Sequence, residues 1–198
     1  VPPDREVLHV LPQEFIVDDQ GGIKDPIGMM GARLEVAVHI VTGSALSVGN
    51  IHTCIQHAGY TLESLTLSCL AAAEATITER EREMGIALID VGAGITGVAV
   101  YADNAVRHTG TVPLGGRHVT NDLAIGLRTP VDSAETIKTE AYVDGMSAGV
   151  DWDATVTVPG VGDQPERTVS RRMIGAIVAP RLEEIFQLAA REIQKAPT

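Results

Sequence analysis

Hydrophobic and polar positions alternate along two stretches near the start of the chain. Residues 7–17 alternate loosely and residues 32–42 alternate cleanly, so both are predicted to be strands. A turn is predicted at residues 18–22, a helix from about residue 47 to 58, and a third strand at 61–67. Together these elements predict a small α+β unit. The apolar face of the second strand, predicted to be half-buried, consists of Leu34, Val36, Val38 and Ile40.

The middle of the chain changes from a helical pattern to a strand pattern. Residues 70–82 are predicted to be one helix, and the charged run at 78–83 is predicted to be its solvated end. Short strands are then predicted at 86–89, 98–101 and 105–112, joined by a glycine-rich turn and a turn at an asparagine. This spacing predicts a tight antiparallel meander.

The last third of the chain is predicted to be mainly helical. A helix is expected at 115–127, and a second helix is expected to begin with a capping box of Asp132 and Glu135. Residues 144–168 are rich in Gly, Pro and Asp, with one strand at 155–158. A long helix is predicted from about residue 170 to 195, with a kink or break at Pro180.

Composition and charge exclude several classes of function. The chain has 198 residues, 44% of them hydrophobic, and a formal net charge of -11, which argues against a nucleic-acid partner. Cys54 and Cys69 match neither a zinc site nor a disulfide framework, and we expect two buried free thiols. No signal peptide or membrane-spanning run is visible. Because the sequence starts at Val1 rather than Met, we expect a piece cut from a longer protein, truncated at both ends.

A glycine-rich turn carries the clearest candidate chemistry. Asp90 ends an apolar strand, and Gly92, Ala93 and Gly94 follow it. Glycines let backbone N–H groups approach a phosphate, and a nearby carboxylate can hold Mg²⁺ through its waters. The alternative is an ordinary hairpin turn with an incidental aspartate. The motif alone leaves both interpretations open.

Two weaker candidates follow the glycine-rich turn. Glu135 and Lys138 share one helix face and either contact a ribose and base or form a solvated ion pair. Gly115 and Gly116 precede a Thr-Asn-Asp run ending at Asp122, which marks either a domain hinge or a polar helix face. The sequence contains no recognisable motif of a nucleophile and its general base, and no catalytic residue or metal site is predicted.

Several segments, in this order, resemble the FtsA family of bacterial actin-like cell-division proteins. The resemblance is carried by the stretches VLHVLPQEFIVDDQGGIKDPIGMMGARLEVAVHIVTG, NIHTCIQHAGY, LAAAEATITEREREMGIALIDVGAGITGVAVY, VRHTGTVPLGGRHVTNDLAIGLRTPVDSAETIK and RRMIGAIVAPRLEEIF. It covers nearly the whole chain. It implies an α+β, α/β fold of the actin-like ATPase superfamily (ribonuclease-H-like), with an inserted small α+β subdomain, 1C, of the SHS2 type.

The resemblance also implies subdomain limits. Residues 1–69 are similar to subdomain 1C and 70–84 to the return helix of subdomain 1A. Residues 85–122 resemble subdomain 2A with its phosphate-2 hairpin, 123–173 resemble subdomain 2B, and 174–198 resemble the helix that returns to 2A.

Site residues follow from the same resemblance. Contacts to nucleotide phosphates and Mg²⁺ are implied for Asp90, Gly92, Ala93, Gly94 and Thr96. Adenosine contacts are implied for Glu135 and Lys138, and the segment entering the second domain is matched by Gly115, Gly116 and Asp122. The family loop usually reads Asp-Ile-Gly-Gly-Gly-Thr-Thr-Asp, whereas Ala93, Ile95 and Gly97 stand here, which predicts weak nucleotide binding. Arg171, Arg172 and Arg181 are candidates for binding an acidic FtsZ tail, or are solvated helix surface.

The family implies a scaffold whose full-length form binds ATP or ADP with Mg²⁺ and hydrolyses ATP weakly or not at all. The implied partners are the FtsZ C-terminal tail, further copies of the protein, and late division proteins at 1C. A C-terminal amphipathic helix, absent from this sequence, implies attachment to the cytoplasmic face of the inner membrane at the septum. We expect the 198 residues alone to bind ATP poorly or not at all. The alternatives are a PilM-like pilus platform and an actin-like ATPase or chaperone.

Overall fold

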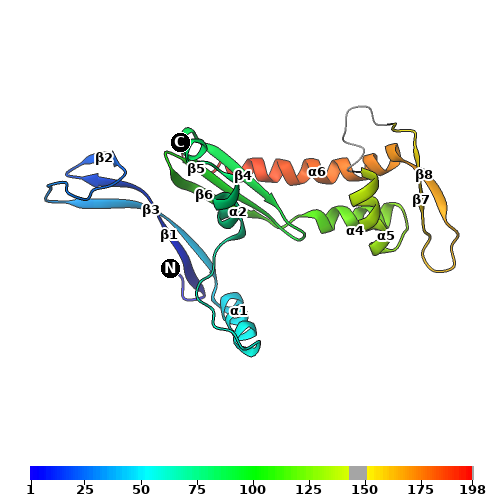
Figure 1. Cartoon of the computed structure of the whole chain (residues 1–198), viewed down its shortest axis with the longest axis horizontal. Coiled ribbons are helices and arrows are strands. Elements are labelled where there is room, and N and C mark those ends of the chain that lie inside the picture. The colour runs from blue at the N-terminus through cyan, green and yellow to red at the C-terminus, as the bar shows by residue number, and fades with distance from the viewer. Residues whose placement is uncertain (143–150, 198) are drawn as a thin grey trace. The chain divides into compact units, whose positions relative to one another are not determined.

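A computed structural model describes residues 1–142 and 151–197 of the chain (Figure 1). These residues form two compact units, which are described in turn. Unit 1 consists of Val1–Asp90, Gly97–Gly110 and the last residues from Glu192 onward. Unit 2 consists of Val91–Thr96 and Thr111–Arg191.

Unit 1 begins with a long antiparallel ribbon. Strand β1 (Arg5–Val17) pairs with β3 (Leu34–Ser44) on one side and with the short β2 (Gln20–Ile23) on the other. The hairpin between β1 and β2 turns at Asp18 and Asp19, whose φ angles are 47° and 69°. Both strands were predicted, but the predicted turn at 18–22 is too long. Its second half is β2, because two residues with positive φ are enough to close a hairpin.

The two faces of the ribbon differ. Both register shifts in the β1–β3 ladder place an extra residue in β1, so β3 is regular along its length. One face packs on the rest of unit 1. The other face, predicted to be half-buried, is largely exposed because no described element covers it. The exposed fractions on this face are 56% for Val10, 61% for Leu34, 47% for Val36 and 48% for Ile40.

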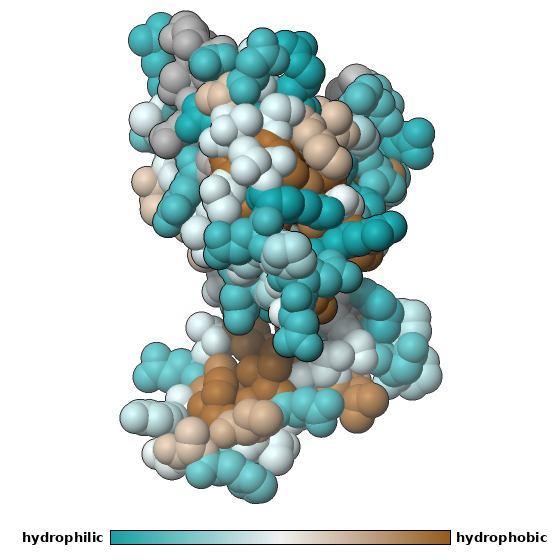
Figure 2. Space-filling model, turned by 90° about the vertical axis from the view of Figure 1, so that its right-hand side faces the viewer, coloured by the Kyte–Doolittle hydropathy of each residue, from teal (hydrophilic) through white to brown (hydrophobic). Residues whose placement is uncertain are grey.

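Helix α1 (Ala45–His57) follows β3 and buries none of its residues. The Ser44 hydroxyl caps its N-terminus, and Gly59 ends it with a φ of 84°. Figure 2 shows hydrophobic surface in its lower part, where Figure 1 places α1. The predicted strand at 61–67 is wrong: this segment is irregular and pairs with no described strand, although the N–H of Leu67 donates to the His9 ring of β1 at 3.2 Å. A cavity of about 540 Å³ is lined by this segment, α1 and the start of β1.

The core of unit 1 lies under a three-stranded sheet. The sheet has the order β4 (Ile86–Val91), β5 (Thr96–Ala102) and β6 (Ala105–Val112), which confirms the predicted meander. Helix α2 (Ser68–Thr76) packs against it through a cluster made of Cys69, Leu70, Ala73, Ala99 and Tyr101. Cys69 is buried as predicted, whereas Cys54 is exposed, because α1 packs on nothing that covers it.

The predicted helix at 70–82 is two helices. Helix α2 ends at Thr76, and α3 (Glu79–Met84) starts with a capping box of Thr78 and Glu81. Arg82, predicted to be solvated, is largely buried: its guanidinium lies 5.1 Å from the centre of the Tyr101 ring and donates to Glu74 at 2.9 Å. A cation over an aromatic face is stabilised by the ring quadrupole, which helps to explain why the Arg82 guanidinium is largely buried.

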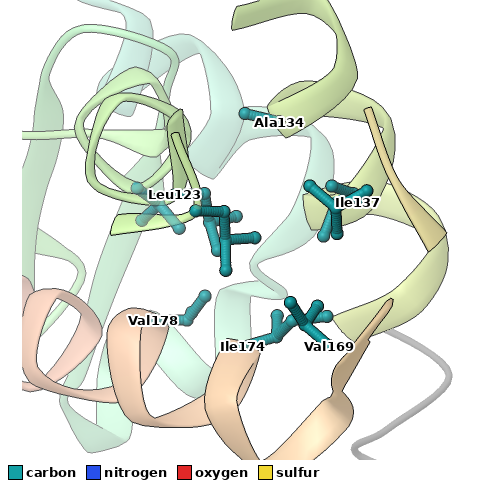
Figure 3. Packing of buried hydrophobic residues seen from close by; sticks show 9 residues of the cluster. Leu123, Ala134, Ile137, Val169, Ile174 and Val178 are labelled. Atoms are coloured by element: carbon teal, nitrogen blue, oxygen red, sulfur yellow. The ribbon is translucent and has the colours of Figure 1, made fainter. Parts of the chain in front are cut away.

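Unit 2 is mainly helical. Its elements are α4 (Gly116–Gly126), α5 (Val131–Thr136), the π-helical turn η1 (Ile137–Tyr142), the hairpin of β7 (Thr155–Val158) and β8 (Arg167–Ser170), and the long helix α6 (Arg171–Ile193). Helix α6 extends into unit 1 at its last residues. The hydrophobic core joins all of these elements (Figure 3) and contains Val119, Leu123, Leu127, Ala134, Ile137, Val158, Val169, Ile174 and Val178.

Three predictions for unit 2 need correction. Of the predicted kink or break at Pro180, the break is absent, because helix α6 continues through this residue. Helix α5 begins after Pro130 without a side-chain cap, so Asp132 lies inside the helix and forms no capping box with Glu135, whose carboxylate is bonded to Lys138. Strand β8 was not predicted. Part of the predicted loop, residues 144–150, lies outside the described residues.

Candidate functional site

The glycine-rich loop after β4 is docked on the first turn of α4. The N–H of Gly116 donates to the carbonyl of Gly92 at 2.9 Å, and the N–H of Arg117 donates to the carbonyl of Ala93 at 2.7 Å. Within the loop, the N–H of Gly92 donates to the carbonyl of Ile95 at 2.9 Å. The first N–H groups of a helix have no partner inside it, so the loop carbonyls satisfy two of them.

Gly115 allows this contact. A Cβ atom at Gly115 would lie 2.4 Å from the carbonyl oxygen of Gly92, closer than side-chain carbons approach backbone atoms. A Cβ at Gly116 would lie 3.5 Å from the Lys138 ammonium and 3.8 Å from the same carbonyl, which is ordinary contact. The two neighbouring glycines therefore have different roles, and only the first is required by close packing.

The loop keeps two donors free. Within the described residues, the N–H groups of Ala93 and Gly94 make no hydrogen bond, and a Cβ at Gly94 would meet nothing within 4 Å. Neighbouring free N–H groups in a turn form a concavity that suits an anion. Asp90 lies in β4, two residues before Gly92 in the sequence.

Thr96, a candidate for phosphate or Mg²⁺ contact, is engaged differently. Its side chain is fully buried, and its hydroxyl donates to the carbonyl of Leu114 at 2.8 Å. A hydroxyl has one proton to donate, so this bond takes it away from a ligand in the described conformation. Thr96 fixes the start of β5 against the segment that leads into α4.

Glu135 and Lys138 form a polar cluster with the start of α4. The Lys138 ammonium donates to the Glu135 carboxylate at 2.7 Å, to the Thr120 hydroxyl at 3.0 Å and to the Gly116 carbonyl at 3.3 Å. The Thr120 hydroxyl also donates to Glu135. The predicted ion pair of Glu135 and Lys138 therefore exists, and it lies next to the glycine-rich loop, which the sequence alone did not establish.

The charge of Glu135 is stabilised by this cluster. Hydrogen bonds from Lys138 first, and then from Thr120, lower the pKa of the Glu135 carboxyl below its usual value. The lysine side chain is 21% exposed and that of the glutamate 50% exposed, so a ligand can reach the pair from solvent. The pair can accept hydroxyl groups at the carboxylate and offer the ammonium to an anion.

Asp122 and Arg181 join α4 to α6. The guanidinium donates two bonds to the carboxylate, of 2.6 and 3.2 Å, and a third to Glu184. The side chains of Arg181 and Asp122 are 26% and 29% exposed. A bidentate pair holds both groups in a fixed geometry. Arg181, a candidate for binding a partner, is therefore committed to an internal contact, and Asp122 holds α6 in place.

The other two candidate arginines lie at the start of α6. The Arg172 guanidinium meets the Asp153 carboxylate at 3.0 Å, and both side chains are highly exposed, at 70% and 81%. Arg171 is bonded through its backbone N–H to the carbonyl of Ala154. The Trp152 ring lies close to α6, since a Cβ at Gly175 would be 3.1 Å from it. This tryptophan, 42% exposed beside the two arginines, has no motif in the sequence that marks it as a site residue.

The described residues hold neither a cluster of metal-ligating side chains nor a membrane-spanning helix. No three or more His, Cys, Asp or Glu side chains in residues 1–142 and 151–197 are grouped as metal ligands. Across the same residues, no helix has the length and apolarity to cross a bilayer.

Sequence comparison decides the family. The profile described as "Cell division protein FtsA" matches residues 87–196, and that described as "SHS2 domain inserted in FTSA" matches residues 1–42. The chain belongs to the FtsA family. The SHS2 match falls on the β1–β3 ribbon of unit 1.

Curated FtsA proteins align along almost all of this FtsA-family chain. The protein from Neisseria meningitidis is 41% identical over 99% of the chain, and that from Pseudomonas aeruginosa 39% identical over 99%. The protein from Bacillus subtilis is 35% identical over 98%. The chain spans about half the length of these relatives: 47%, 47% and 44%.

Solved structures confirm the actin-like fold. MreB5 of Spiroplasma citri bound to AMPPNP superposes with a TM-score of 0.62 at 17% identity, over 78% of this chain and 49% of that one. A PilM–PilN type IV pilus biogenesis complex gives 0.63 at 16% identity, over 100% of this chain and 48% of that one. At these identities the likeness is one of fold, so the PilM-like alternative keeps the fold but not the family.

Proposed function

We propose that this chain is part of a cell-division scaffold that polymerises on the cytoplasmic face of the membrane at the division septum. Its full-length form tethers FtsZ filaments there and recruits later division proteins. The observation that supports this proposal is its 41% identity to a curated FtsA protein along almost the whole chain. The membrane contact is assigned to a C-terminal amphipathic helix outside the given sequence, and recruitment of late partners to the 1–69 segment.

The nucleotide part of the proposal rests on unit 2. Ala93 and Gly94 would offer their free N–H groups to phosphate, and Lys138 and Glu135 would contact the adenosine side. Asp90 belongs to unit 1, and its proposed contact with Mg²⁺ through water rests on the family motif rather than on the geometry of unit 2. The negative phosphates of ATP with Mg²⁺ would accept hydrogen bonds from these N–H donors. Gly92, Gly115 and Gly116 would act through the backbone by keeping the loop against α4, and Thr96 and Asp122 by fixing the packing around it.

We expect the 198 residues alone to bind MgATP poorly or not at all. Ala93, Ile95 and Gly97 replace a glycine, a hydroxyl and a carboxylate of the usual family loop. Isothermal titration calorimetry of the chain with MgATP tests this. Binding in the nanomolar to low-micromolar range would contradict the expectation. Loss of that binding in Lys138→Ala would then assign it to the site described above.

The FtsZ tail is proposed to bind near the start of α6. Arg171 and Arg172 supply positive charge there, and Trp152 and Met173 supply exposed apolar surface, at 42% and 47%. Arginine binds carboxylates bidentately, and aromatic side chains are frequent anchors at interfaces. Arg181 would support this surface from its internal bond with Asp122 and would not contact the tail directly.

Fluorescence anisotropy with a labelled FtsZ tail peptide tests the tether. Saturable binding is expected, weakened about fivefold by Arg172→Glu, since charged contacts at a partly exposed interface contribute on the order of 1 kcal/mol. The matched control is Arg80→Glu, which changes an exposed arginine in unit 1 and should leave binding unchanged. A folded chain, verified by circular dichroism, that binds no peptide would contradict this assignment.

A further inference from the structure

Two histidine rings meet where the β1–β3 ribbon lies on β6. His39 of β3 and His108 of β6 both belong to unit 1, and their ring centres are 6.3 Å apart. The His39 Nε2 atom lies 2.9 Å from the Thr109 hydroxyl, and the Gln13 side-chain amide donates to the carbonyl of Val106 at 2.8 Å. These bonds hold the ribbon on the edge strand of the β4–β6 sheet. The ring pair is therefore part of the contact that seats the ribbon.

His108 also contacts the end of α6. Its Nε2 atom lies 3.3 Å from the Glu192 carboxylate, which also accepts a bond from the Lys195 ammonium at 2.6 Å. The His108 and Glu192 side chains are only 19% and 20% exposed. A Cβ at Gly110 would lie 2.6 Å from a Glu192 oxygen, so this glycine leaves room for the carboxylate beside β6. His108 therefore has a negative neighbour that can balance its charge.

His39 has no such neighbour. Its ring nitrogen is bonded to the neutral hydroxyl of Thr109, and no carboxylate of the described residues offsets a charge on it. The other charged or titratable side chains of β1, β3 and β6 are engaged elsewhere. Their contacts are Arg107 with Asp103, Glu35 with Arg33, Glu14 with the Gly22 N–H, Arg5 with Thr42, His9 with the Leu67 N–H, and Glu6 with the cavity beside α1. The charged group that faces His39 is therefore His108, backed by Glu192 and Lys195.

A proton on His39 is disfavoured while the ribbon is docked. Burial first, and then the His108 ring, lower the pKa of the His39 imidazole below its ordinary value. The pKa of the Glu192 carboxyl is also lowered, chiefly because Lys195 donates to it, so this carboxylate stays ionised while the rings titrate. The Thr109 hydroxyl can donate or accept, so its bond serves either form of His39. The two rings, rather than this bond, make the contact sensitive to charge.

We propose that His39 and His108 form a pH-sensitive switch that releases the ribbon from β6 when both rings are protonated. Glu192 balances the charge of one ring, and the second charge is left opposite the first without a counter-ion. Like charges repel more strongly where water is partly excluded. Leu11, which is opposite His39 in the ladder, packs against the core of unit 1, and its burial opposes release. Release therefore requires the second proton. The switch lies within one chain and does not depend on the proposed function.

The direction of the pH effect follows from the pKa of His39. An ordinary imidazole has a pKa of about 6.5, and that of His39 is lower in the folded chain. The stability that neutral His39 gives to the docked ribbon is fully present above about pH 6.5 and is lost as the pH falls through the lowered pKa. Release is therefore expected in mildly acidic solution and should be reversed by neutralisation.

NMR titration of the histidine rings in the whole chain tests the coupling. In His108→Gln the midpoint of His39 should rise, because the opposing charge is gone. In His108→Lys, which keeps a positive charge throughout the titration, the midpoint should stay low. Loss of packing alone would raise the midpoint in both variants, so equal midpoints would overturn the proposal. The matched control is His57→Gln, which changes an exposed histidine of α1 and should leave His39 unaffected.

Thiol labelling tests the release itself. Leu11→Cys places a thiol where the ribbon meets the core, and the exposed Cys54 is the internal reference for the effect of pH on the reagent. Labelling at position 11 relative to Cys54 should rise severalfold between about pH 8 and about pH 5, the range in which histidine changes charge. Adding His39→Gln, which can bond Thr109 but takes up no proton, should abolish the rise.

Two controls separate release from other events. The fluorescence of Trp152 in unit 2 should stay constant over the same pH range, which distinguishes release from unfolding of the chain. A labelling ratio that does not change with pH would overturn the proposal, as would an equal rise with glutamine at position 39. The ring titration needs no cysteine at position 11, so it decides the matter if that change disturbs the ribbon. Tail-peptide binding is measured on unit 2, so failure here leaves the tether proposal testable.

Discussion

Substitution of Gly115 by alanine tests the docking of the glycine-rich loop on α4. The new methyl carbon would lie 2.4 Å from the carbonyl oxygen of Gly92. Carbon and oxygen need about 3.2 Å, so the loop or the helix must move by about 1 Å, and the obstacle is backbone rather than a flexible side chain. That movement strains the two bonds that join the loop to Gly116 and Arg117.

The magnitude follows from those contacts. Each intramolecular hydrogen bond contributes about 0.5–1.5 kcal/mol net, so weakening two of them costs about 1–3 kcal/mol. The matched control is Gly116→Ala, where the new carbon meets only ordinary contacts. Because Gly116 is the first residue of α4, alanine there should leave stability unchanged or raise it by up to about 1 kcal/mol.

Trp152 provides the assay. It is the only tryptophan in the chain and lies against α6, so its fluorescence reports unfolding of unit 2. A difference of about 3 kcal/mol between the two variants, at a urea slope of about 2 kcal/mol/M, separates their midpoints by about 1.5 M. If both variants unfold at the same midpoint, the loop is not held against α4 as described. Tail-peptide binding should survive in both, because the proposed peptide surface does not include the loop.

Two further predictions concern the cores. Leu123→Ala should destabilise unit 2 by about 2–5 kcal/mol, because Leu123 is fully buried, whereas Ile125→Ala on the same helix, 77% exposed, should change stability by less than about 0.5 kcal/mol. Urea unfolding measured by tryptophan fluorescence distinguishes the two variants, and similar losses of stability would contradict the burial of Leu123. A thiol reagent should label Cys54 quickly and Cys69 only after unfolding, because Cys69 is buried and burial raises the pKa of its thiol. The stability contributed by the neutral Cys69 thiol is retained below the usual thiol pKa and is lost as the pH rises through the raised pKa. Rapid labelling of both thiols in the folded chain would contradict the burial of Cys69.

The sequence predicted those parts of the fold that depend on local pattern. Alternation found β1 and β3, and the loop–strand spacing found the β4–β6 meander. The local pattern failed where a strand depends on pairing with another segment of the chain. Residues 61–67 contain Leu62, Leu65 and Leu67 but form no ladder, and β8, with the largely polar sequence Arg-Thr-Val-Ser, pairs only with β7.

The candidate site shows the same division. The glycine motif and the Glu135–Lys138 pair could be identified from the sequence, since the residues of each lie close together in the chain. The commitment of Thr96 to the Leu114 carbonyl and of Arg181 to Asp122 was not, because the partners lie 18 and 59 residues away. Hydrogen bonds between distant residues leave no periodic trace in a sequence. A threonine that matches a ligand-binding motif can therefore have its proton engaged elsewhere.

Helix α4 is held at three places along its length. Its first turn is bonded to the glycine-rich loop, Thr120 to the Glu135 carboxylate, and Asp122 to Arg181 of α6. These bonds connect the start of α4 to three different elements of unit 2. We therefore expect a ligand at the glycine-rich loop to affect α6 through α4, and Trp152, whose ring lies against α6, is a fluorescent reporter of that helix.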